Sequence, residues 1–108
     1  MKVIEVLYFD GCPGAEPALA AVKEVVRSLN LDDVEVRFVS VQAADAQRLR
    51  FLGSPSVRVD GVDVEPGADE RDGFAMRCRV YAVDGRFQKV PPTMWIEAAL
   101  TQTPRGAA

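Results

Sequence analysis

The sequence of 108 residues contains no histidine, only two cysteines and a single tryptophan. The absence of histidine excludes a Cys–His nucleophile pair, a histidine general base and a histidine-ligated zinc site within one chain. With 13 Lys and Arg residues against 16 Asp and Glu residues, the net charge is −3, which does not support a nucleic-acid footprint. No apolar run approaches the ~20 residues that cross a bilayer, and the start of the chain lacks the layout of a signal peptide. We therefore expect a cytoplasmic protein with neither nucleic-acid nor membrane partners.

What the chain does contain is an ordinary globular composition, with 48% hydrophobic and 27% charged residues. This length suffices for one domain with its own core and without disulfide staples. We predict one domain over residues 1–102 and a disordered tail over residues 103–108, where the apolar pattern ends. In a reducing compartment, the two cysteines are expected to be free or redox-active rather than joined in a structural disulfide.

An apolar strand, a tight turn and an amphipathic helix occupy the first 30 residues. The strand, Val3–Phe9, is apolar at nearly every position, which is typical of a strand covered on both faces. The turn reads Gly-Cys-Pro-Gly, and the helix follows from Glu16 onward with Asn30 as its C-terminal cap. Cys12 is therefore predicted to lie at or beside a helix N-terminus, where unsatisfied N–H groups and the macrodipole favour a thiolate.

The rest of the chain predicts three more strands and two more helices. The strands are Val34–Val39, Ser56–Val59 and Phe74–Val83, and the helices are Ala43–Leu52 and a last one from Thr93 onward. Asp60-Gly61 indicates a turn, after which Val-Asp-Val either extends the strand or pairs back on it. The polar stretch Glu65–Gly73 is predicted as an exposed loop at the end of the sheet away from Cys12. The order β-α-β-α-β-β-α predicts an α/β fold: a mixed four-stranded sheet flanked by helices.

The strings YFDGCPGAEPAL, RLRFLGSPSVRVDG and CRVY, in this order of elements, resemble the thioredoxin-like superfamily. They look most like a branch of small proteins sometimes labelled alkylmercury lyase-like, and the resemblance covers nearly the whole chain up to the last helix. It implies a thioredoxin-like fold in which Pro55 is cis and lies against the turn of Cys12. It also implies that the backbone of Ser54 is free to pair with an extended substrate thiol. Catalysis would then rest on Cys12, and substrate binding on Gly11, Pro13, Ser54 and Pro55.

The turn departs from the Cys-x-x-Cys motif of that superfamily, because Ala15 stands where the second cysteine would be. We therefore predict a monothiol protein: Cys12 attacks the disulfide of a protein or a low-molecular-weight thiol, and an external thiol resolves the product. The alternative is a non-enzymatic binding module with an inert Cys12, in which the Ser54–Pro55 region docks a partner. A third function, cleavage of organomercurials, is implied only by the label and needs two converging thiolates. No bound cofactor or metal is predicted.

Cys78 allows two interpretations. It shares one face of the predicted fourth strand with Met76 and Val80, which is typical of a core cysteine held well short of Cys12. The alternative is a second thiol that resolves a sulfenate or a mixed disulfide after local rearrangement, or that supplies a second soft ligand. Three arginines are predicted to share a sheet face, paired with acids or forming an anion site, and the pairing is favoured. These are Arg58, Arg77 and Arg79.

Overall fold

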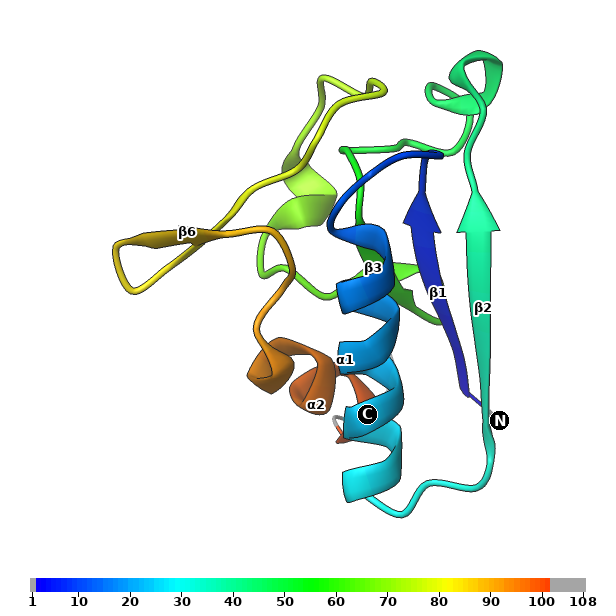
Figure 1. Cartoon of the computed structure of the whole chain (residues 1–108), viewed down its shortest axis with the longest axis vertical. Coiled ribbons are helices and arrows are strands. Elements are labelled where there is room, and N and C mark those ends of the chain that lie inside the picture. The colour runs from blue at the N-terminus through cyan, green and yellow to red at the C-terminus, as the bar shows by residue number, and fades with distance from the viewer. Residues whose placement is uncertain (1, 102–108) are drawn as a thin grey trace.

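A computed structural model describes residues 2–101 of the chain as a four-stranded sheet, a separate two-stranded ribbon and two α-helices (Figure 1). The elements are β1 (Lys2–Tyr8), α1 (Ala15–Ser28), β2 (Val34–Ser40), β3 (Ser56–Val59), β4 (Val62–Asp63), β5 (Tyr81–Val83), β6 (Arg86–Gln88) and α2 (Thr93–Thr101). The sheet order is β2-β1-β3-β4, with β1 parallel to β2 and β3 antiparallel to both β1 and β4. The predicted α/β class with a mixed four-stranded sheet is confirmed. The predicted tail, residues 103–108, lies outside the described residues.

The main core lies between the sheet and both helices. Its buried side chains alternate along β1 and β3 and recur at helical spacing along α1 and α2; they include Ile4, Val6, Val57, Val59, Ala18, Val22, Val25, Ile96 and Leu100. A smaller cluster contains Leu7, Val41, Ala46 and Phe51. Because neighbouring residues of a strand face opposite sides, Leu7 places this cluster on the other face of the sheet from Val6. Both α-helices therefore cover one face, and the prediction of helices on both faces is wrong.

The predicted helix over Ala43–Leu52 does not continue beyond its first turns. A 3₁₀ helix, Ala43–Asp45, is followed by turns. These turns close in a Schellman motif, in which the Phe51 N–H donates to the Ala46 carbonyl at 2.9 Å. Arg50 takes the left-handed position of the motif, with φ of 55°, where glycine is usual. The chain turns here because Phe51 is completely buried in the smaller cluster, and this burial outweighs continued helix formation.

The fourth strand of the sheet also differs from the prediction. Asp60-Gly61 forms a two-residue turn with φ of 50° and 84°, the positive values of a type I′ hairpin, so β4 pairs back on β3. The Asp84-Gly85 turn has φ of 50° and 76° and joins β5 to β6 in the same way. The predicted strand Phe74–Val83 therefore forms only β5 at its end. Its first seven residues carry no regular structure apart from one isolated bridge.

Candidate functional site

The turn at residues 11–14 connects β1 to α1 and carries Cys12. The Cys12 N–H donates to the Phe9 carbonyl at 3.2 Å, and the Cys12 carbonyl accepts from the Ala15 N–H at 3.2 Å. Helix α1 begins at Ala15 with Gly14 as its N-cap, and no side chain caps this end. Cys12 itself is partly exposed. The backbone of the cysteine is therefore held on both sides, two residues before the helix cap, with its side chain in reach of solvent.

Pro55 lies directly against this turn. The Ser54–Pro55 peptide bond is cis, the isomer that the resemblance implies, and Pro55 is completely buried. A Cβ atom at Gly14 would stand 3.0 Å from Pro55 Cδ and 3.1 Å from the Lys89 carbonyl oxygen, so the close approach depends on glycine. Ser54 Oγ accepts a hydrogen bond from the Phe9 N–H at 3.3 Å, where the chain leaves β1. The structure thus brings the turn together with Ser54 and Pro55.

The backbone of Ser54 is already paired, so the expectation that it is free for a substrate is wrong. The Ser54 N–H donates to the Arg77 carbonyl at 2.8 Å, and the Ser54 carbonyl accepts from the Arg79 N–H at 2.9 Å. Together these bonds form a parallel bridge in which Cys78 stands opposite Ser54. The chain's own segment, residues 77–79, therefore takes the backbone groups of Ser54 that a substrate would have used.

Cys78 is not a core residue, as the first interpretation of the sequence had it, but is exposed. The sequence placed Cys78 in the fourth strand of the sheet, but residues 62–63 form that strand instead. Residues 74–80 are then left to run along the end of the sheet where β1 finishes and β3 begins. The predicted separation of the two cysteines therefore no longer follows from the position of Cys78 in a sheet strand, and it stays a prediction.

Tyr81 was not singled out from the sequence, yet its side chain holds the carbonyl of Pro55. Its Oη donates to the Pro55 oxygen at 2.5 Å, and the residue is 0% exposed. The ring stacks beneath the guanidinium of Arg79 at 4.6 Å and meets the edge of Trp95 at 6.2 Å. Burial raises the pKa of Tyr81 above its ordinary value, which keeps the phenol protonated as a donor. The one sequence signal was the alternation that placed Tyr81 on the same strand face as Arg79.

Replacing Tyr81 by phenylalanine should lower the free energy of unfolding by about 1–3 kcal/mol, because the buried Pro55 carbonyl loses its donor. Urea unfolding measures this loss. Tyr8→Phe is the matched control, since it removes a hydroxyl from a partly exposed ring that stacks on Phe38; we expect a change within about 0.5 kcal/mol. Equal losses in the two variants would contradict a role of the Tyr81 hydroxyl in fixing Pro55.

Arg79 is 3% exposed and joins β3, β4 and the residues that follow β4. Its Nη1 donates to Asp63 Oδ2 at 2.7 Å and to Ser56 Oγ at 2.9 Å, and its Nη2 donates to Asp63 Oδ1 at 3.1 Å and to Glu65 Oε1 at 2.6 Å. Burial by itself lowers the pKa of Arg79, but the hydrogen bonds and attraction from Asp63 and Glu65 outweigh it and raise the pKa above its ordinary value. The predicted pairing of this arginine with acids is confirmed. The other two arginines donate to the backbone carbonyls of Leu49, Arg50 and Gly73.

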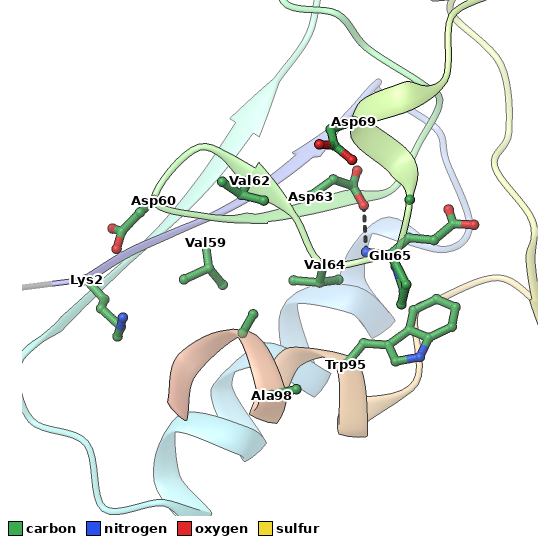
Figure 2. Close-up of a pocket in the computed structure, with 13 residues that line it drawn as sticks. Lys2, Val59, Asp60, Val62, Asp63, Val64, Glu65, Asp69, Trp95 and Ala98 are labelled. Carbon is green, nitrogen blue, oxygen red and sulfur yellow. Dashed lines mark hydrogen bonds between the residues drawn. The ribbon is translucent and has the colours of Figure 1, made fainter. Parts of the chain in front are cut away.

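A cavity of about 490 Å³ lies between the β3–β4 hairpin, the loop after β4 and helix α2 (Figure 2). Its lining combines the ring of Trp95 and several valines with the carboxylates of Asp60, Asp63, Glu65 and Asp69. Lys2, at the start of β1, also lines it, so the cavity and the first part of the Glu65–Gly73 loop lie at the end of the sheet away from Cys12. The predicted place of the loop holds only for this first part, because Gly73 at its end is hydrogen-bonded to Arg77, which pairs with Ser54 at the other end of the sheet. The cavity and the cysteine turn are therefore separate features of the molecule.

Comparison of the chain with protein-family models, with characterised proteins and with solved structures finds no match. Among residues 2–101, no three or more His, Cys, Asp or Glu side chains are grouped so that they could hold a metal ion. Neither helix in that range is long and apolar enough to cross a membrane. Function must therefore be argued from the geometry around Cys12 and Pro55.

Proposed function

We propose that this chain is a thioredoxin-like monothiol protein that exchanges disulfides through Cys12. The observation that carries the proposal is the packing of the cysteine turn on the buried Pro55, with Gly14 in close contact and the cysteine itself partly exposed. Two parallel strands followed by antiparallel ones support the thioredoxin-like assignment. The missing second helix is a departure from the order β-α-β-α-β-β-α.

The start of α1 faces the turn that carries Cys12. The N–H groups there have no side-chain cap, so their positive partial charge is directed toward the turn. Glu16 lies in the first turn of the same helix and carries the opposite charge.

The exchange requires only this thiol and an external disulfide. The Cys12 thiolate attacks one sulfur of the disulfide, the sulfur–sulfur bond breaks, and the other half leaves as a thiolate. The product is a mixed disulfide on Cys12, and a second thiolate then attacks it and restores the protein thiol or replaces the bound group. Because Ala15 stands in the turn where a second cysteine would be, the second thiol comes from outside the turn.

The reactivity of Cys12 tests the proposal. In a Cys78→Ser variant Cys12 is the sole thiol, and we expect it to react with iodoacetamide at pH 7 faster in the folded protein than in the same variant unfolded in urea. Intact mass after incubation of the folded variant with oxidised glutathione should show one glutathione bound. No glutathione adduct, with no faster alkylation than in the unfolded chain, would sink the proposal.

A second candidate function, a binding module with an inert Cys12, is favoured by the cavity beside Trp95. Its volume of about 490 Å³ falls within the range of small-molecule sites. Since Pro55 is buried and the Ser54 backbone is paired, a ligand would enter this cavity rather than dock at Ser54–Pro55. Trp95 is the only tryptophan, so its fluorescence reports on the cavity alone. Under this function Cys12 alkylates like an unfolded thiol, and Cys12→Ser leaves any ligand response of Trp95 unchanged.

A further inference from the structure

The segment Arg77–Cys78–Arg79 pairs with Ser54 through the residues on either side of its cysteine. The Arg77 carbonyl and the Arg79 N–H take both backbone groups of Ser54, at 2.8 and 2.9 Å. Cys78 therefore stands directly opposite Ser54 at about one strand spacing, roughly 4.8 Å between backbones. Its exposed side chain is free of any disulfide.

The segment that carries Cys12 contacts the same dipeptide through the residues on either side of the cysteine. The Phe9 N–H donates to Ser54 Oγ at 3.3 Å, and the Phe9 carbonyl accepts from the Cys12 N–H at 3.2 Å. The far end of the turn packs on Pro55 through Gly14. Two separate segments thus contact the dipeptide Ser54–Pro55, and each carries one of the two cysteines of the chain.

We propose that Cys78 is the internal resolving thiol for Cys12. The inference rests on the proposed function, because it acts on the mixed disulfide that Cys12 forms. The Cys78 thiolate attacks Sγ of Cys12, the bond from that sulfur to the bound thiol breaks, and the bound group leaves as a thiolate. A Cys12–Cys78 disulfide remains, so both cysteines are oxidised and both halves of the external disulfide have been reduced. A dithiol reductant later returns the two electrons and reopens the bond.

The two backbones must approach for this bond to form, because a disulfide needs Cα atoms about 4.4–6.8 Å apart. Cys78 belongs to residues 74–80, which have no regular structure. Only two backbone hydrogen bonds join this stretch to Ser54. Beyond it, Arg79 and Tyr81 are buried and anchored by their own side-chain contacts. The anchored residues thus leave only those that precede Arg79 free to move, and Cys78 stays close to Ser54.

Reaction with one equivalent of the chromogenic aromatic disulfide 5,5′-dithiobis(2-nitrobenzoate) tests the inference. The folded wild-type protein should release both aromatic thiolates and retain no adduct, since the second cysteine displaces the group left on the first. The Cys78→Ser variant should release one thiolate and retain one adduct on Cys12. Peptide mapping of the wild-type product should show Cys12 joined to Cys78, and the second release should proceed at a rate independent of protein concentration.

Each other outcome of this experiment decides against the inference. If wild type retains the adduct as Cys78→Ser does, the inference falls while the exchange chemistry of Cys12 stands. If the second release accelerates with protein concentration, the disulfide joins two chains and the internal role is overturned. If Cys78→Ser forms no adduct on Cys12, while the unfolded variant does, the proposed function and this inference both fail. Serine matches the size of the exposed Cys78, and a circular dichroism spectrum equal to wild type establishes that the variant is folded.

Discussion

Replacing Arg79 by methionine is expected to destabilise the folded protein by about 3–5 kcal/mol, because the change removes one partner of a buried ion pair. Asp63 loses both of its guanidinium contacts, and Glu65 keeps only its contact with Arg71 at 2.9 Å. Domains of this size are stable by about 5–15 kcal/mol in total, so the variant should lose a large share of its stability. Urea unfolding at pH 7 measures the change.

Two further variants distinguish the loss of the buried ion pairs of Arg79 from the loss of any single arginine charge. Arg48→Ala breaks an ion pair in which the Arg48 side chain is 68% exposed and the Asp45 side chain 40% exposed, and we expect a loss of no more than about 1 kcal/mol. The double variant Arg79→Met with Asp63→Leu removes both buried charges and should recover part of the stability lost in the single variant. A single Arg79→Met variant as stable as Arg48→Ala would contradict a structural role for the network.

The regular part of the fold followed from local patterns. A continuous apolar run predicted β1, alternation of apolar and polar residues predicted β3, and helical spacing predicted α1, because each pattern reflects burial against a neighbouring layer. Asn30 was correctly placed at the end of α1: it has a φ of 55°, and its N–H donates to the Arg27 carbonyl at 3.1 Å. The Asp60-Gly61 dipeptide correctly indicated a turn, but the sequence left open whether the next residues pair back on β3.

The incorrect predictions of secondary structure share one physical cause, which is competition from long-range contacts. The pattern of residues 43–52 is compatible with a helix, yet burial of Phe51 ends it at Arg50. The alternation in residues 74–83 is compatible with a strand, yet the hairpin at Asp60-Gly61 had already supplied the fourth strand. Nothing local distinguishes these outcomes, because the deciding partners lie far away along the chain.

Long-range contacts also limited the prediction of the site around Cys12. The turn of Cys12 is local, and the helix that follows was predicted from residues close by. The placement of Pro55 against that turn came from the resemblance, since the two segments are 43 residues apart along the chain. Tyr81 and the bridge to Cys78 were missed because both depend on the irregular course of residues 74–80. The contacts of Tyr81 and Cys78 thus became visible only in the structure, because an irregular segment positions both residues.

Gly53→Ala is expected to destabilise the protein by about 2–5 kcal/mol, the sum of backbone strain and crowding. The backbone of Gly53 has a φ of 127°, and an added Cβ would stand 3.0 Å from both the Arg77 carbonyl oxygen and Arg79 Cβ. These atoms belong to the segment that pairs with Ser54, so relief of the contact must push that segment away. The rate of Cys78 alkylation, measured in a Cys12→Ser background, should therefore rise together with the loss in urea stability.

Gly67→Ala is the matched control for this effect. Gly67 also has a positive φ, 79°, but an added Cβ there would meet nothing within 4 Å. The control should lose only the cost of a left-handed residue, about 1–2 kcal/mol, and should leave the alkylation of Cys78 unchanged. If both alanine variants lose the same stability and neither alters the reactivity of Cys78, the segment beside Ser54 is not held by the close approach of Gly53. A selective effect at Gly53 would instead tie the exposure of the second thiol to a single backbone contact next to Pro55.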